Sequence, residues 1–160
     1  MTTQTSVLFV CMGNICRSPS AEAVFKALVE EQGLADRIRC DSAGTIGFHA
    51  GQPADRRMMQ AAEKRGYRLE SISRQVRPDD FKRFDYIIAM DMDNLDGLRP
   101  FSRNGDGKAK VSLMCDYARE HDLREVPDPY YGGQQGFELV LDLLEDACAG
   151  LLDELRKASS

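Results

Sequence analysis

A cysteine and an arginine six positions apart give the first indication of chemistry in this chain. Cys11 ends an apolar run, and Arg17 follows it across a short loop. Ser18 and Pro19 come next and are typical of a helix start. A loop between a strand end and a helix N-terminus directs backbone N–H groups inward, where they form a cradle for an anion. The spacing therefore predicts a thiol that faces a bound phosphate.

The residue types of this loop suit that chemistry. Gly13 and Asn14 tolerate the backbone conformations that a tightly curled loop needs. A helix N-terminus or a nearby cation lowers the pKa of a thiol from about 8.5 to between about 3.5 and 7.5. We therefore expect Cys11 to react as a thiolate. The planar guanidinium of Arg17 suits two phosphate oxygens, and the Ser18 hydroxyl is placed to donate a hydrogen bond to the sulfur.

A phosphate ester also needs a proton donor for its leaving oxygen. Asp128 is the best candidate, because Pro129 favours an extended conformation at the preceding residue and so projects its carboxyl group from a loop. The rings of Tyr130 and Tyr131 are expected to line the pocket and partly desolvate that carboxyl group. On the residues alone, an Asp-Pro pair is more often simply a turn.

The composition limits the class of protein. The chain has 160 residues, 42% hydrophobic and 29% charged, which fits a single globular domain over residues 1–160. Its formal net charge of -5 disfavours binding to nucleic acid. Five cysteines without a repeated spacing predict neither a disulfide framework nor a structural zinc site. No apolar stretch reaches the roughly 20 residues of a membrane span, so we expect a cytoplasmic protein.

Strands and helices are expected to alternate along the chain. Short apolar runs predict strands at residues 6–10, 38–42, 84–90 and 110–114. Apolar positions at helical spacing predict helices at residues 19–32, 54–65 and 137–155, with a short one opening at 91–93. Ser18 is the expected N-cap of the first helix. This alternation predicts an α/β fold with a parallel sheet, in which ligands bind beyond the carboxyl ends of the strands, where Cys11 lies.

Residues 10–19, Val-Cys-Met-Gly-Asn-Ile-Cys-Arg-Ser-Pro, resemble the signature of the low-molecular-weight protein tyrosine phosphatases. The similarity extends to the Asp-Pro-Tyr-Tyr segment at 128–131 and covers essentially the whole chain. It implies a three-layer, flavodoxin-like (phosphotyrosine phosphatase I-like) fold: a central four-stranded parallel sheet flanked by helices, with no metal or cofactor. It also implies Cys11 as nucleophile, Arg17 as phosphate clamp and Asp128 as general acid and base, with a cysteinyl-phosphate intermediate.

The resemblance assigns further roles around the loop. The residues expected to bind phosphate are Met12, Gly13, Asn14, Ile15, Cys16 and Ser18. Phe48, where relatives often carry an aromatic residue, is expected to form a pocket wall opposite Tyr130 and Tyr131. A deep aromatic pocket favours phosphotyrosine over the shorter phosphoserine. Under oxidation Cys16 is a candidate disulfide partner for Cys11, and the alternative is that it simply packs the loop.

Two more positions bear on support of the loop. Asp91 and Asp93 are expected mainly to cap a helix. The family often has a histidine shortly before an Arg-Gln pair, whereas residues 71–75 here read Ser-Ile-Ser-Arg-Gln. We therefore expect no supporting ring from this segment.

Two other functions stay open at this point. An arsenate reductase uses the same loop but needs further cysteines to pass on a disulfide, and residues 87–98 contain none. A phosphoprotein-binding module without turnover would not need Cys11, Arg17 and Asp128 together. The expected partners are tyrosine-phosphorylated proteins, with a bacterial tyrosine kinase as one candidate by family analogy. The expected state is a monomer or a weak homodimer formed through Tyr130 and Tyr131.

Overall fold

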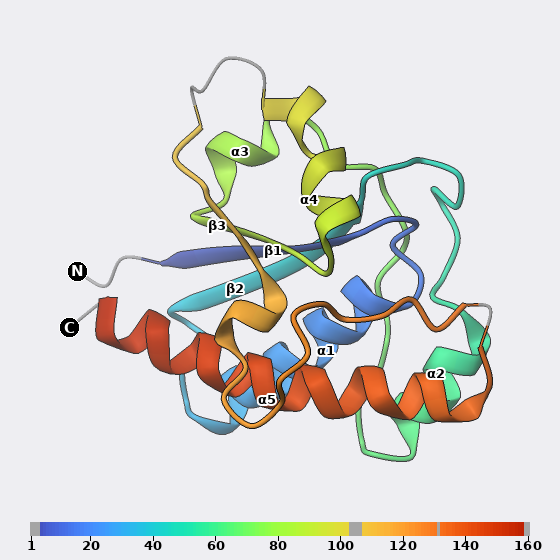
Figure 1. The fold of residues 1–160 in the computed structure, drawn as a ribbon. Coiled ribbons are helices and arrows are strands. Elements are labelled where there is room, and N and C mark those ends of the chain that lie inside the picture. Colours follow the sequence, from blue (N-terminus) through green and yellow to red (C-terminus); the bar gives the residue numbers. More distant parts are fainter. Residues whose placement is uncertain (1–3, 103–106, 131, 159–160) are drawn as a thin grey trace.

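The computed structural model describes residues 4–102, 107–130 and 132–158. At its centre is a four-stranded parallel sheet in the order β2-β1-β3-β4, with helices on both faces (Figure 1). The strands are β1 (Thr5–Cys11), β2 (Ile38–Gly44), β3 (Tyr86–Ala89) and β4 (Lys110–Leu113). The predicted three-layer α/β architecture is confirmed.

The central strand β1 separates two hydrophobic clusters. Val7 and Phe9 point to the cluster beneath α1 and α5, whereas Leu8 and Val10 point to the cluster on the opposite face. All four side chains are completely buried. Residues 7–10 are buried on both faces of the sheet, which is why they read as a continuous apolar run.

The helices are α1 (Arg17–Glu31), α2 (Arg56–Glu63), α3 (Asp80–Arg83), α4 (Met92–Gly97) and α5 (Gln134–Ala158). Two short 3₁₀ turns, η1 (Arg99–Ser102) and η2 (Met114–Tyr117), complete the described elements. Helices α1 and α5 pack against one another on one face of the sheet (Figure 1). The helix α3 and both 3₁₀ turns were not predicted, because each is a single turn without a periodic apolar face. No helix in the described part of the chain is long and apolar enough to cross a membrane.

The predicted start of α1 was wrong. The N-cap is Cys16 rather than Ser18, and no side chain caps the helix. Pro19 is the third helical residue, still within the first turn, where its missing N–H costs nothing. The Ser18 hydroxyl faces the Cys11 sulfur instead. A contact within the functional loop has replaced the local capping bond.

Gly33, Asp55 and Asp91 set three other helix boundaries. Gly33, with φ of 71°, comes directly after the α1 C-cap. The α2 helix starts at Arg56, later than predicted, because the Asp55 carboxylate accepts hydrogen bonds from two N–H groups of its first turn. The Asp91 carboxylate caps α4 as predicted, accepting from Asn94 N. These ends set the loops that surround the carboxyl edge of the sheet.

Candidate active site

The loop between β1 and α1 lies at the carboxyl edge of the sheet (Figure 1). Cys11 is the last residue of β1 and pairs in register with Gly44 of β2. Asn14 has φ of 57° and is the only described non-glycine residue with positive φ. This left-handed conformation turns the chain back so that α1 begins close to the strand end.

The Cys11 sulfur is held from the first turn of α1. The Ser18 hydroxyl oxygen lies 3.0 Å from Cys11 Sγ, and the Ser18 backbone N–H donates to the same sulfur at 3.4 Å. Cys11 is 3% exposed. The Ser18 hydroxyl group and backbone N–H thus give this buried sulfur two hydrogen-bond partners in place of water.

Asn14 connects the loop to two neighbouring segments. Its side-chain amide donates to Ser18 Oγ at 2.8 Å and to Ser42 Oγ at 3.0 Å. Its side-chain oxygen accepts from the Arg74 backbone N–H at 3.0 Å. Both N–H bonds and the carbonyl oxygen of this buried side-chain amide thus have hydrogen-bond partners. These bonds stabilise the left-handed backbone conformation of Asn14. The side chains of Asn14 and Ser18 support the loop and do not line the cavity.

Residues 71–75 do support the loop, although they have no histidine. The Ser73 hydroxyl donates to the Gly13 carbonyl oxygen at 2.9 Å, and Arg74 N–H holds Asn14 as described. The expectation of no supporting ring holds, but a hydroxyl and a backbone amide supply the support. Sequence reasoning missed Ser42, in β2, and Ser73, in a loop, because a single serine carries no signal of its own.

The Arg17 guanidinium is almost completely buried beside the cysteine. Its NH1 nitrogen donates to Asp91 Oδ2 at 2.5 Å and to the Val126 carbonyl oxygen at 3.0 Å. Its NH2 nitrogen lies 3.6 Å from Asp128 Oδ2. Burial disfavours the charged guanidinium, but Cys11, Asp91 and Asp128 outweigh burial and raise the pKa of Arg17.

Asp91 therefore has two roles, of which the sequence predicted one. Oδ1 of its carboxylate caps α4, while Oδ2 fixes the guanidinium of Arg17. A signal for the second role did exist. Asp91 follows β3, the neighbour of β1, and the carboxyl ends of adjacent parallel strands meet at one edge.

A cavity of about 170 Å³ opens above Cys11. Its lining residues are Cys11, Met12, Gly13, Ile15, Cys16, Arg17, Ile46, Phe48, His49, Asp128 and Tyr130. Phe48 is 81% exposed and Tyr130 is 36% exposed, so both lie at the mouth. The Asp128 carboxylate is 35% exposed and accepts from the Tyr130 backbone N–H at 3.0 Å. Tyr131, the other expected wall residue, lies outside the described residues.

His49 is a lining residue that the sequence did not reveal. Its ring packs on Gly13, where an added Cβ would lie only 2.9 Å from the imidazole Cδ2. Phe48 contacts it edge-on, with 4.9 Å between ring centroids. Only the fold brings this loop beside the cysteine: backbone bonds from Thr45 and Ile46 to the carbonyl groups of residues 11 and 12 hold it there.

Cys16 lies in the same loop as Cys11, and both are free thiols in this structure. Burial, together with the negative charges of Asp55, Cys11 and Asp128, raises the pKa of the Cys16 thiol well above its usual range. Cys16 is therefore a neutral thiol. Cys16 is thus the less suited of the two loop cysteines to act as a nucleophile, since the thiolate is the reactive form.

The model of one protein family, described as low molecular weight phosphotyrosine protein phosphatase, matches residues 6–160. The chain belongs to this family. A low molecular weight protein-tyrosine-phosphatase of Streptomyces coelicolor is 46% identical, over 94% of this chain and 93% of its own. The human low molecular weight phosphotyrosine protein phosphatase is 41% identical, over 93% and 94%.

Solved structures of the family show the same fold. A protein tyrosine phosphatase from Entamoeba histolytica superposes with a TM-score of 0.93 at 47% identity, covering 98% of this chain and 100% of its own. A Drosophila arginine phosphatase superposes with a TM-score of 0.86 at 35% identity, covering 93% of this chain and 96% of its own. The chain is thus a protein tyrosine phosphatase, a hydrolase that acts on phosphotyrosine in proteins.

Proposed function

We propose that this phosphatase hydrolyses phosphotyrosine in two steps, with Cys11 as nucleophile, Arg17 as phosphate clamp and Asp128 as general acid and base. The observation that carries this assignment is that all three side chains line one cavity. The sulfur lies buried at its floor, whereas the carboxylate lies at its half-exposed rim. An ester bound between them would present phosphorus to the sulfur and its leaving oxygen to the carboxyl group.

In the first step the Cys11 thiolate attacks phosphorus and the bond from phosphorus to the phenolic oxygen breaks. The Asp128 carboxylic acid gives its proton to that oxygen, so phenol leaves and a cysteinyl-phosphate forms. In the second step water attacks phosphorus and gives a proton to the Asp128 carboxylate. The sulfur–phosphorus bond then breaks, which releases phosphate and restores the thiolate.

Arg17 and the loop N–H groups bind the phosphoryl oxygens throughout both steps. Asp91 and the Val126 carbonyl group hold the guanidinium in one orientation, so no reorganisation is needed as charge builds up on the equatorial oxygens. Such preorganised electrostatics are usually the largest contribution to catalysis. The loop residues Met12, Gly13, Ile15 and Cys16 surround the same space.

The assignment is tested with aryl phosphates of graded leaving-group quality, assayed beside arsenate with a thiol reductant. Cys11→Ser is expected to abolish turnover and keep phosphate binding. Asp128→Asn is expected to lower kcat most for poor leaving groups, since these need the proton most. An equal kcat in Asp128→Asn and wild type for every ester would refute the role of Asp128. Reduction of arsenate without ester hydrolysis would instead support the reductase.

The residues at the cavity mouth also bear on the substrate and on the oligomeric state. We infer that the aromatic mouth formed by Phe48 and Tyr130 selects phosphotyrosine, and that a bacterial tyrosine kinase is one substrate. Self-association through Tyr130 would cover the cavity, so a weak homodimer would inhibit itself. Sedimentation at increasing concentration, with activity measured in parallel, tests this.

Localisation and domain organisation are further parts of the proposal. The five free cysteines support a reducing, cytoplasmic setting. Both hydrophobic clusters include residues of β1, which supports a single domain.

We also propose that Cys16 protects Cys11 by forming a disulfide under mild oxidation. The two residues share one short loop, and both are almost completely buried. Activity lost to peroxide should then return with a thiol in the wild type but not in Cys16→Ala. Full recovery of Cys16→Ala would show that no such protection operates.

A further inference from the structure

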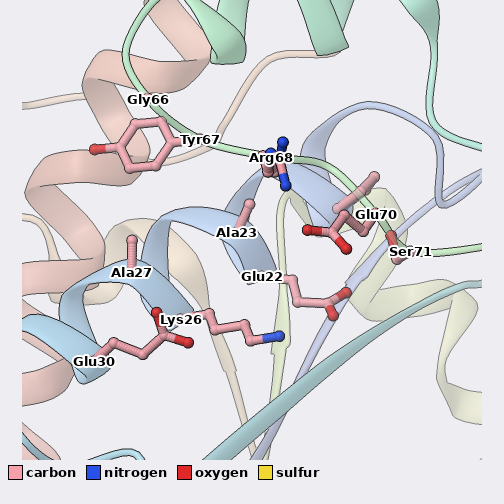
Figure 2. A pocket seen from close by; sticks show the side chains of 11 residues that line it. Glu22, Ala23, Lys26, Ala27, Glu30, Gly66, Tyr67, Arg68, Glu70 and Ser71 are labelled. Carbon is pink, nitrogen blue, oxygen red and sulfur yellow. The ribbon is translucent and has the colours of Figure 1, made fainter.

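A second pocket, of about 240 Å³, lies between α1 and residues 66–71 (Figure 2) and shares no lining residue with the cavity above Cys11. Charged residues from α1 and from residues 66–71 line it, among them Glu22 and Glu70. Burial raises the pKa of the Glu22 carboxyl group. The Ser42 hydroxyl donates to Glu22 Oε1 at 2.6 Å, so this carboxylate is tied to the sheet. Nothing in the mechanism above uses Glu22.

Hydrogen bonds connect Glu22 to the catalytic sulfur. From Glu22 the contact to Ser42 Oγ is 2.6 Å, and from Ser42 Oγ to Asn14 Nδ2 it is 3.0 Å. The same Asn14 nitrogen lies 2.8 Å from Ser18 Oγ, which lies 3.0 Å from Cys11 Sγ. Ser18 and Glu22 are one turn apart on α1, so both face the same strand. We call these five residues the relay.

The direction of each bond in the relay is fixed by the groups at its ends. The Asn14 side-chain nitrogen only donates, so Ser42 accepts from Asn14 and gives its own hydrogen to Glu22 Oε1. The Asn14 amide cannot flip, because its oxygen accepts from Arg74 N–H. Its two N–H groups therefore go to Ser42 and Ser18. Ser18 Oγ accepts one of them, and its own hydrogen is left for the Cys11 sulfur or for the more distant Ala43 carbonyl oxygen at 3.4 Å.

We propose that Glu22 is a positioning residue that orients the relay so that Ser18 donates to the Cys11 thiolate. This inference rests on the proposed role of Cys11. Without the carboxylate, the Ser42 hydroxyl is free to rotate and the Asn14 amide loses one firm partner. The Ser18 hydrogen bond matters most in the second step, when the thiolate is the leaving group.

The kinetic signature is a split between two constants. The value of kcat includes the second step, whereas kcat/KM reports only events up to formation of the cysteinyl-phosphate. For Glu22→Ala we expect kcat to fall about five-fold, the effect of weakening one charge-assisted hydrogen bond, while kcat/KM stays nearly constant. Glu22→Gln keeps an acceptor oxygen for Ser42 and should restore most of kcat. A residue with only a structural role would lower both constants together.

The experiment compares Glu22→Ala and Glu22→Gln with Glu70→Gln, which removes a charge from the same pocket without touching the relay. Ser42→Ala breaks the relay from the other side and serves if Glu22→Ala fails to fold. A lower kcat in Glu22→Ala and Ser42→Ala, with Glu70→Gln at the wild-type value, supports the proposal. Unchanged kcat in both relay variants, or an equal fall in Glu70→Gln, overturns it. Turnover by Cys11→Ser would overturn the proposed function instead.

Discussion

Replacing Gly44 with alanine would place a methyl group under the phosphate-binding loop. Gly44 ends β2 beside Cys11. A Cβ at this position would lie 2.7 Å from the Met12 carbonyl oxygen, 3.0 Å from the Ile46 carbonyl oxygen and 3.2 Å from Asn14 N. All three atoms belong to the backbone, so no side-chain rotation would relieve the overlap. The loop itself would have to move.

Overpacking a well-filled site costs about 1–3 kcal/mol. If that cost falls on the loop geometry that binds the transition state, kcat/KM drops by about 5- to 150-fold. In the proposed mechanism inorganic phosphate binds to the same loop N–H groups, so its inhibition constant should rise in parallel. The three atoms nearest to the new methyl group are all polar, so these contacts add no apolar packing.

The assay measures kcat/KM for an aryl phosphate and the inhibition constant of phosphate, with urea unfolding to monitor stability. Gly47→Ala is the matched control: its nearest neighbours are atoms of the flexible Gln75 side chain, at 3.2 Å and beyond. We expect this control to stay within about two-fold of the wild type. Wild-type kcat/KM and phosphate affinity in a folded Gly44→Ala variant would refute the reasoning.

Two further predictions concern stability. In Gly150→Ala the new Cβ on α5 would overlap the Tyr117 carbonyl oxygen. The free energy of unfolding, measured in urea titrations, should therefore fall despite a gain of about 1 kcal/mol in helix propensity. The control Gly136→Ala, whose new Cβ would make only an ordinary contact at 3.6 Å, should not lose stability. Burial would raise the pKa of Asp146, but hydrogen bonds from three backbone N–H groups and from the His121 ring outweigh burial and lower this pKa to about 2. The unfolded value is about 3.9. Its stabilising contribution is therefore complete above about pH 4 and lost toward pH 2. The advantage of wild type over Asp146→Asn should shrink across that range, and a constant difference would contradict the assignment.

The core of the site could be predicted because its parts are contiguous. The cysteine, the loop and the helix start all fall within residues 11–19, and short-range patterns specify each of them. The one local error, Ser18 as N-cap, arose because a tertiary contact with the sulfur replaced the expected capping bond. Local rules fail where a polar side chain has a better partner elsewhere.

The supporting residues were harder to predict because they come from distant segments. Ser42 reaches Asn14 through the pairing of β1 with β2, and Ser73 reaches Gly13 from 60 positions away. His49 and Asp91 are brought in by loops that follow neighbouring strands. Local sequence patterns do not specify which strands are neighbours or in which register they pair. These contacts can therefore be predicted only once the sheet order is known.

The central claim is that Cys11 carries the phosphoryl group during turnover. Rapid acid quenching of the enzyme with an aryl phosphate, followed by peptide mass spectrometry, tests it directly. We predict a phosphoryl adduct on Cys11 that forms within the first turnover and is absent from Cys11→Ser. An adduct on Cys16, or a full first turnover of product with no phosphorylated cysteine, would contradict the account.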